Sequence, residues 1–417
     1  MTGRYVLRIL NNLGKGECLK AMTDNFNEDS LANDERNESL PEESRMFAYY
    51  QPVSTNNKVW DASEGGGGGF FGCERAALGN AMYNYPYHGG LNQQFVWFQL
   101  DDGRFAIANK QNGLVLQKYQ FTNQIKEIVS LPWESNYAQL WRKESTSATN
   151  FRLVNEADAL EVCGGNTSAQ AKMSFIPNRP DNALLFKRRA IAQNNVVPAL
   201  PSKQPLPALP ILSNLNDPAP HETARAITGS SLVPCIMVSD YIPVSQRIKD
   251  SPYYRLVKKQ FWKRLWHDTF IPGEYREFQE TTGMSKTQQE GMTQTTNISL
   301  QADFGFAYKA LTLGLGVSIS RSIEISRSTT DTVMSQYTDK QGYTNQNSFK
   351  LSWAKYALAT EFILMRKDGT TAGSWEAVDK KVTRSISYPP TKSLSWTKSI
   401  GDQEDNTVFE PTTIESD

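Results

Sequence analysis

The sequence is poor in the residues that build catalytic and metal centres. Among 417 residues there are only three histidines, His88, His221 and His267, and none belongs to an HExxH pair. The four cysteines lack the close spacing of zinc ligands. We find no nucleophile elbow, no phosphate-binding loop, no dinucleotide fingerprint and no recognisable pair of catalytic carboxylates. We therefore predict a protein that is not an enzyme and that holds no metal and no cofactor.

Two further absences concern membranes and nucleic acids. No apolar run approaches the roughly 18 residues of a transmembrane helix, and the first ten residues lack the apolar core of a secretory signal. Lys and Arg together number 44, as do Asp and Glu, so the formal net charge is zero. No overall positive potential therefore favours a nucleic-acid partner. Any action on a membrane is therefore expected to come from a soluble protein that rearranges.

The first half of the chain contains many short, strand-like runs, which favour an all-β fold. Two runs share a Gln-Trp signature, Gln94-Phe-Val-Trp97 and Gln139-Leu-Trp141, and their tryptophans lie 44 positions apart. This period predicts a β-trefoil, with Trp97 and Trp141 in the shared core and residues 5–19 as its first repeat. Trefoils of this type often bind sugars. The candidate glycan-binding residues, on shallow loops, are Asp101, Asp102 and Asn109.

The composition changes after the predicted trefoil, for which we expect residues 1–178. Seven prolines fall within residues 196–220, and proline excludes both a helix and a central strand. We therefore predict an extended linker over residues 179–221 and a second, elongated β domain over residues 222–417. In that domain Lys367-Asp-Gly369 separates two strand-like runs and is typical of a hairpin turn. Five glycines, Gly65–Gly69, indicate a flexible loop of unknown role.

A long amphipathic segment begins near residue 298. Apolar residues occupy even positions up to Tyr308 and odd positions from Leu311 to Ile325 except Arg321, while the other face is small and polar except for Asp303 and Glu324. A two-residue turn at Lys309-Ala310 would place both apolar sets on one face of a hairpin. Such a face suits either a half-buried sheet or a strand pair of a membrane barrel. The predicted insertion residues are Ile298, Leu300, Phe304, Phe306, Tyr308, Lys309, Leu311, Leu313, Leu315, Val317 and Ile319.

Several motifs resemble the insecticidal Toxin-10 family, which includes the components of the mosquitocidal binary toxin. The most specific is Gly229-Ser-Ser-Leu-Val-Pro-Cys-Ile-Met-Val-Ser-Asp240. Also similar are residues 251–266, the run Trp375-Glu-Ala-Val-Asp379 and, in the first half, residues 98–108. The glycine run and the acidic stretch at residues 24–45 depart from the family's pattern. The resemblance nevertheless covers nearly the whole chain.

The resemblance implies a ricin-type, lectin-like trefoil joined to an aerolysin-type β pore-forming domain. It implies storage in a parasporal inclusion of a sporulating bacterium, release in the insect gut, and binding to a glycan or glycoprotein receptor. Self-association as a crystal dimer and then as a membrane oligomer would precede insertion of a β-barrel into the target-cell membrane. The alternative is a non-lytic, receptor-binding subunit that needs a partner toxin. The same resemblance implies a disulfide between Cys73 and Cys163 and a buried Cys235.

Overall fold

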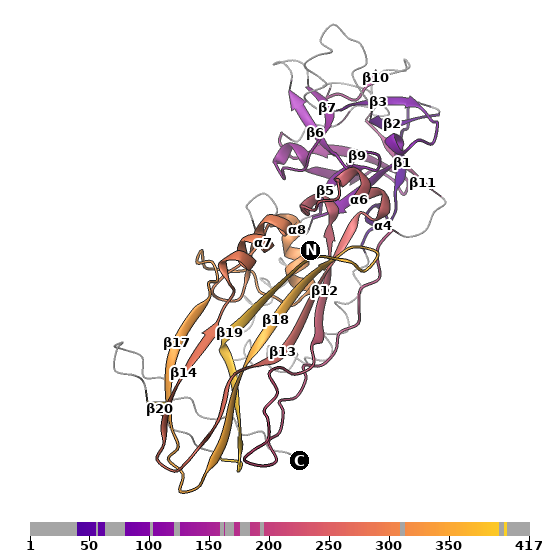
Figure 1. Cartoon of the computed structure of the whole chain (residues 1–417). Coiled ribbons are helices and arrows are strands. Elements are labelled where there is room, and N and C mark those ends of the chain that lie inside the picture. The colour runs from indigo at the N-terminus through magenta and orange to yellow at the C-terminus, as the bar shows by residue number, and fades with distance from the viewer. Residues whose placement is uncertain are drawn as a thin grey trace, which may run out of the picture. The chain divides into compact units, whose positions relative to one another are not determined.

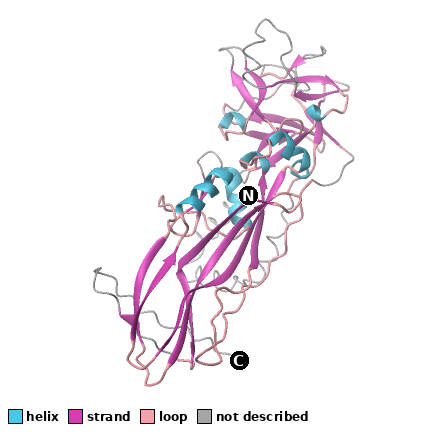
Figure 2. Cartoon of the chain, in the orientation of Figure 1, coloured by secondary structure: helices cyan, strands magenta, loops and turns pink. Residues whose placement is uncertain are grey.

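The computed structural model of this chain is built mainly of strands, with a few short helices (Figure 2). It describes residues 40–391 except residue 56 and the segments 63–79, 101–102, 121–125, 159–161, 163–170, 176–183, 192–195 and 309–312, and it also describes residues 396–397. The run of five glycines and the predicted strand at 5–19 lie outside the described residues. The predicted all-β class is confirmed.

The first half forms a β-trefoil whose strands follow one another in three groups (Figure 1). The first group comprises β1 (Ala48–Pro52), β2 (Lys58–Ala62), β3 (Asn80–Pro86) and β4 (Phe95–Gln99). The second comprises β5 (Arg104–Asn109), β6 (Val115–Gln120), β7 (Lys126–Leu131) and β8 (Trp141–Ser145). The third contains β9 (Asn150–Asn155), β10 (Ala171–Lys172) and β11 (Phe186–Ala190), and β11 closes the fold by pairing with β1 and β9.

Two boundaries differ from the predicted ones. The first repeat is formed by β1–β4, so the assignment of residues 5–19 to that place is wrong. Strand β11 lies inside the range predicted as a linker, so the trefoil extends beyond residue 178. The sequence pattern of β11 is short and highly charged, which is why it does not stand out as a strand before its pairing partners are known.

The repeat period is 46 positions, as shown by two pairs of side chains. The Oε1 atom of Gln93 accepts from the backbone N–H groups of His88 and Gly89, and that of Gln139 accepts from those of Glu134 and Ser135. Asn109 and Asn155, also 46 apart, each donate to two carbonyl groups of the preceding turn. Trp141 therefore corresponds to Phe95, not to Trp97, and the 44-residue spacing of the tryptophans is not the structural period.

Aromatic side chains fill the trefoil core. Trp60, Trp97 and Trp141 are fully buried. The ring of Tyr50 stacks on Trp60 with centroids 4.7 Å apart and on Trp97 at 5.0 Å. Trp141 also donates its indole N–H to the carbonyl of Leu116 at 2.9 Å. The Gln-Trp residues thus serve packing and leave ligand binding to the loops.

Among its described residues, the second half contains two antiparallel sheets of three or more strands and one two-stranded sheet within residues 298–308. The larger consists of β12 (Ala226–Pro234), β13 (Tyr253–Phe270), β18 (Leu351–Met365) and β19 (Thr371–Tyr388). The smaller consists of β14 (Tyr275–Thr282), β17 (Tyr337–Thr344) and β20 (Trp396–Thr397). As predicted, Gly369 turns the chain between β18 and β19, at a φ of +89°. Short helices lie at α4 (Glu42–Arg45), Leu91–Gln93, Tyr137–Gln139, Cys235–Met237 and α6 (Val244–Asp250).

The proline-rich segment, residues 196–220, is extended but is packed on the larger sheet. Leu212 is buried against Trp262 and Tyr356. Trp262 donates its indole N–H to the carbonyl of Pro207 at 3.1 Å, and Tyr356 donates its hydroxyl to that of Pro220 at 2.8 Å. Proline supplies carbonyl acceptors but no N–H donors, so this segment covers the sheet through side-chain donors rather than as an added strand.

A buried ion pair joins the two sheets of the second half. Glu280 on β14 accepts from Lys355 on β18 at 2.8 Å, from the indole of Trp266 at 2.8 Å and from the hydroxyl of Tyr343 at 2.7 Å. The aromatic side chain of Phe278 stacks on Trp266 beside it, with ring centroids 4.2 Å apart. The carboxylate is therefore satisfied in an otherwise aromatic environment.

Candidate functional site

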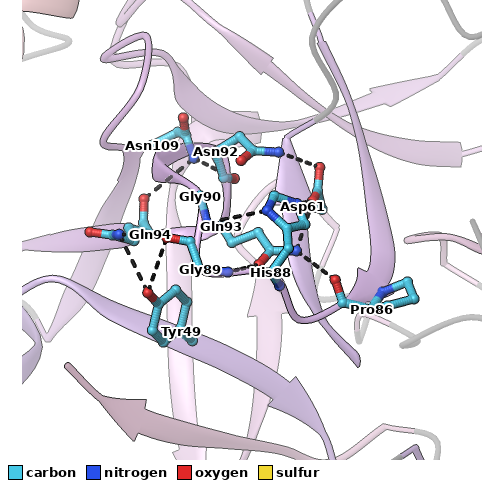
Figure 3. A network of polar contacts seen from close by, with 10 residues as sticks. All are labelled: Tyr49, Asp61, Pro86, His88, Gly89, Gly90, Asn92, Gln93, Gln94 and Asn109. Atoms are coloured by element: carbon cyan, nitrogen blue, oxygen red, sulfur yellow. Dashed lines mark hydrogen bonds and ion pairs between the residues drawn. The ribbon is translucent and has the colours of Figure 1, made fainter. Parts of the chain in front are cut away.

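A network of polar side chains lies at one edge of the first trefoil repeat, centred on Asp61 of β2 (Figure 3). The Asp61 carboxylate contacts His88 Nε2 at 3.1 Å, Asn92 Nδ2 at 2.9 Å and Gln93 Nε2 at 2.9 Å. Asp61 is only 6% exposed. A carboxylate offers about four acceptor sites, so these three contacts fix its orientation and leave capacity for one further donor.

The sequence between β3 and β4 builds the loop around this carboxylate. The amide of Gln93 donates to the carbonyl of Pro86 at 3.0 Å and accepts from two N–H groups, which folds residues 86–93 into a tight turn. Gly89 has a φ of +78°, a backbone conformation that favours glycine. The N–H of Gly90 donates to His88 Nδ1 at 3.2 Å, so the proton of this imidazole lies on Nε2, facing Asp61.

Exposed aromatic rings surround the network. Tyr85 is 36% exposed and Tyr87 is 45% exposed. The ring of His88 lies edge-on to Tyr85 at 5.9 Å, and the guanidinium of Arg189 lies 5.0 Å from the centroid of Tyr87. A fixed carboxylate and amide beside exposed aromatic faces can hold a polyhydroxylated ligand, because hydroxyl groups bond to the polar atoms and an apolar sugar face packs on a ring.

The second repeat lacks the equivalent polar pair. Asp61 pairs with Tyr83, and Gln117 pairs with Val129, which is the residue equivalent to Tyr83 at the 46-residue period. Gln117 is therefore equivalent to Asp61. At the same period, Ala138 is equivalent to Asn92. A neutral amide and a methyl group therefore replace the carboxylate and its donor. Of these two repeats, only the first has the constellation that a hydroxyl-rich ligand requires.

Of the three predicted glycan-binding residues, the structure describes only Asn109, and its side chain is not open to a ligand. Asn109 is fully buried, and its amide donates to the carbonyls of Asn92 at 2.9 Å and Gln94 at 3.3 Å. Its assignment to glycan binding is therefore wrong, because the buried side chain stabilises the turn that contains Asn92 and Gln94. Asp101 and Asp102 lie outside the described residues. The missed residues are Asp61 and Asn92; the one available signal was Asn92-Gln93 immediately before the Gln-Trp strand.

Three cysteines were expected to have structural roles. Cys73 and Cys163 lie outside the described residues, so their disulfide stays a prediction. Cys235 is buried and has a free thiol. Burial raises the pKa of that thiol to about 12. Cys235 is therefore a packing residue with little thiolate character.

The amphipathic segment differs from its predicted hairpin. After α7 (Lys286–Thr296), β15 (Ile298–Leu300) and β16 (Phe306–Tyr308) pair so that Ile298 faces Tyr308. The observed turn therefore lies between them, where Phe304 has a φ of +62°, so residues 298–308 are not the single strand that was predicted. The predicted turn at Lys309-Ala310 lies outside the described residues. The second arm, predicted as a strand, is the helix α8 (Leu313–Ser322).

The placement of the predicted insertion residues varies along the segment. Ile298, Leu300, Phe306 and Ile319 are fully buried. Lys309 and Leu311 lie outside the described residues, and Leu313, Leu315 and Val317 fall within α8. Tertiary packing overrides the strand-like alternation here, as it commonly overrides local propensity. Among the described residues, no helix combines the length and apolar character needed to cross a membrane.

The amphipathic segment packs against the larger sheet. The ring of Phe306 lies 5.2 Å from that of Phe362 on β18. At the end of α8, the backbone of Ile323 lies so close to Gly229 of β12 that a Cβ at residue 229 would be 2.9 Å from the Cα of Ile323. Ile298, Leu300, Phe306 and Ile319 of the predicted apolar face are therefore buried within the protein, and Phe306 packs against β18.

This close approach gives a prediction for Gly229→Val. Three added carbon atoms would force Ile323 away from β12, and overpacking of this kind costs about 1–3 kcal/mol of unfolding free energy. We expect a lower melting temperature and faster proteolysis within residues 298–328, measured by calorimetry and by mass spectrometry of the fragments. Thr228→Val is the control, because the buried hydroxyl of Thr228 has no partner; equal stability of the two variants would contradict the prediction.

The chain matches two known protein families, one in each half of the fold. The family described as "Insecticidal Crystal Toxin, P42" matches residues 226–390, and the ricin-type beta-trefoil lectin domain-like family matches residues 91–175. The chain is 31% identical to the binary larvicide subunit BinA of Lysinibacillus sphaericus over 323 residues, which cover 75% of this chain and 86% of that relative. It is 28% identical to the subunit BinB of the same organism over 337 residues, 76% of this chain and 75% of that relative.

A third relative has a crystal structure. The insecticidal crystal protein Cry35Ab1 of Bacillus thuringiensis is 25% identical over 291 residues, 67% of this chain and 74% of that relative. Its crystal structure superposes with a TM-score of 0.68 and 18% identity, covering 83% of this chain and 91% of that one. The two chains therefore share their fold.

Proposed function

This chain belongs to the insecticidal crystal toxin family that includes the binary larvicide subunits, and from that premise we propose that it is a mosquitocidal pore-forming component of a binary toxin. Its trefoil binds a glycan or glycoprotein on gut cells, the chains then oligomerise, and the amphipathic segment contributes to a β-barrel in the target membrane. The proposal depends mainly on one observation. The segment alternates apolar with small polar residues, as a strand between lipid and water does, and in this structure it packs on the protein's own sheet.

The trefoil site supports the binding step. Asp61, Asn92 and His88 present fixed polar atoms next to the exposed rings of Tyr85 and Tyr87. This arrangement suits a terminal sugar of a glycoconjugate rather than a protein surface, because the polar side chains converge on a single carboxylate, that of Asp61.

The amphipathic segment supports the membrane step. Its lipid-facing set in the proposed barrel would be the apolar residues from Ile298 to Ile319 named above, without Lys309, and its polar set consists mainly of Ser, Thr and Gly, which hydrate without a charge partner. In the resting chain, Ile298, Leu300 and Phe306 have no exposure. Insertion would transfer these residues from the protein's sheet to lipid without exposing them to water for long.

A second function also has support. The relatives BinA and BinB are named as subunits of one larvicide, so this chain could act as a receptor-binding subunit that permeabilises nothing without a partner toxin. Release of a vesicle-trapped dye, measured with the protease-treated chain alone, distinguishes the two functions. We further propose that the protein is stored in a parasporal inclusion, forms dimers there and acts after release into the insect gut.

A reducible cross-link between the segment and the sheet tests the membrane step. In Lys203→Cys/Glu324→Cys the two replaced side chains form an exposed ion pair between the proline-rich segment and the end of the amphipathic segment, and residue 204 is hydrogen-bonded to β12, so a short bis-thiosulfonate can join the two cysteines. We expect at least a tenfold lower rate of dye release in the cross-linked form and recovery after reduction, because the segment cannot leave the sheet while it is cross-linked. Binding to gut-cell membranes should not change.

The single variants Lys203→Cys and Glu324→Cys, treated with the same reagent, are the matched controls. They separate the effect of the cross-link from that of the substitutions themselves. Mass spectrometry must show the cross-link, since undiminished leakage from a cross-linked protein would exclude this segment from the pore.

A further inference from the structure

We infer that the trefoil site takes an acidic glycan and that Arg189 of β11 is the residue that selects its acid group. This inference rests on the proposed binding of a glycan at the Asp61 network and names the chemical class of that glycan. Three features support it. Arg189 borders the loop that builds the network, its guanidinium has no counter-charge among the described residues, and the carboxylate of Asp61 is buried and hydrogen-bonded.

Strand pairing places Arg189 beside the loop between β3 and β4. Arg189 is the register partner of Tyr49 on β1. The hydroxyl of Tyr49 donates to the carbonyl of Gly89 at 3.4 Å (Figure 3), and its ring meets that of Tyr87 edge-on, with centroids 4.9 Å apart. The guanidinium of Arg189 lies 5.0 Å from the centroid of Tyr87. Arg189 therefore lies at the rim of the site that this loop forms.

The guanidinium of Arg189 is available to a ligand. Arg189 is exposed, and within the part of the chain that the structure describes no carboxylate forms an ion pair with it. By contrast, the guanidinium of Arg142 in the same trefoil pairs with Glu144 at 3.1 Å and with Glu156 at 3.4 Å. The contact with the face of the Tyr87 ring orients the guanidinium without using its N–H donors. Arg189 can therefore donate two parallel hydrogen bonds to an acid group.

The carboxylate of Asp61 is compatible with an acidic ligand at this rim. A bare, exposed carboxylate would repel a second negative charge. Asp61, however, is only 6% exposed, and its oxygens accept from the side chains of His88, Asn92 and Gln93. These donors offset its charge and leave one acceptor position, which suits a hydroxyl group that donates a proton. The exposed charge at the rim is the positive one of Arg189.

The ligand class follows from these two parts of the site. The remaining acceptor position of Asp61 requires a donor, which a sugar hydroxyl supplies. The guanidinium of Arg189 requires a pair of acceptor oxygens, which either the carboxylate of an acidic sugar or a sulfate ester supplies. A glycan that carries both a free hydroxyl and one such acid group satisfies both requirements, whereas a neutral glycan leaves the guanidinium unpaired.

Binding to matched glycans tests the inference. The full chain is applied to an array of glycan pairs that differ only in one acid group, which is a sulfate ester in one set and a sugar carboxylate in the other. We expect the acidic member of at least one pair to bind about tenfold more tightly than its neutral partner. This preference should shrink as the salt concentration rises, because the ion pair is exposed. The preferred set shows whether the acid group is a sulfate or a carboxylate.

Three variants assign the preference to Arg189. Arg189→Gln should bind both members of a pair as the natural chain binds the neutral one, and circular dichroism should show that it remains folded. Arg189→Lys keeps the charge but loses the planar pair of donors, so it should keep part of the preference. Arg142→Gln is the matched control, because it removes a guanidinium that is already paired within the trefoil, and it should keep the full preference.

The outcomes separate this inference from the proposed function. Equal binding of neutral and acidic glycans, weakened by Asp61→Asn, would overturn the inference and leave the proposed glycan site in place. A preference for the acidic member that persists in Arg189→Gln would overturn the role of Arg189. If no glycan of either kind binds to the natural chain, both the inference and the proposed glycan binding fail.

Discussion

Replacing Glu280 with glutamine is expected to lower the free energy of unfolding by about 3–5 kcal/mol. Its carboxylate is the partner of Lys355, Trp266 and Tyr343, and the side chains of Glu280 and Lys355 are only 10% and 19% exposed. A neutral amide would leave the ammonium group of Lys355 without its counter-charge in a largely aromatic environment. Denaturant unfolding followed by tryptophan fluorescence measures the loss.

Two variants make this test specific. Glu277→Gln changes an exposed carboxylate on the same strand and should alter stability by no more than about 0.5 kcal/mol. Glu280→Gln/Lys355→Met removes both charges, so it should be more stable than Glu280→Gln alone. A Glu280→Gln variant as stable as the Glu277→Gln control would show that the ion pair does not join the two sheets energetically.

The same cluster predicts a loss of stability at high pH. Burial raises the pKa of the Tyr343 hydroxyl well above its ordinary value, and the neighbouring charge of Glu280 raises it further. A raised pKa in the folded state means that the contribution of this group is fully present below pH 10, the unfolded value, and is lost as pH rises above it. Unfolding free energies measured between pH 8 and 11 should therefore fall less steeply for Tyr343→Phe than for the natural chain.

Replacing Asp61 with asparagine is expected to weaken glycan binding by about tenfold to a hundredfold. A hydrogen bond to a charged group contributes about 1.5–3 kcal/mol, and an asparagine amide would point an N–H group towards at least one of the three donors that now meet the carboxylate. Binding of the full chain to a glycan array, followed by titration of the best-bound glycan, measures the change.

The control substitution is Gln117→Asn, at the equivalent position of the second repeat, which should bind as the natural chain does. Because Asp61 is buried, Tyr85→Ala provides a second variant that changes only an exposed ring at the rim. We expect it to weaken binding several-fold with an unchanged melting temperature. Full binding by both Asp61→Asn and Tyr85→Ala would place the glycan elsewhere on the chain.

The sequence predicted the trefoil but not the residues of the candidate glycan site. The Gln-Trp motif indicated a trefoil, because Gln93 and Gln139 recur at the turn and a large aromatic residue, Phe95 or Trp141, follows two positions later in the core. Asp61 and Asn92, however, lie 31 positions apart in the sequence. No local pattern joins them, because their proximity comes from the pairing of β2 with β3 and from the turn that Gln93 holds.

The sequence by itself determined the all-β class, the trefoil, the β18–β19 hairpin and the amphipathic alternation of residues 298–328. Each depends on local rules: turn residues with positive φ, a repeated packing motif and a period of two. Tertiary structure decided that the alternating residues 313–322 form a helix and that residues 196–220 cover a sheet. Both follow from contacts between distant residues, such as Tyr308 with Gly316 and Trp262 with Pro207, whose energies exceed the small local preferences that a sequence pattern expresses.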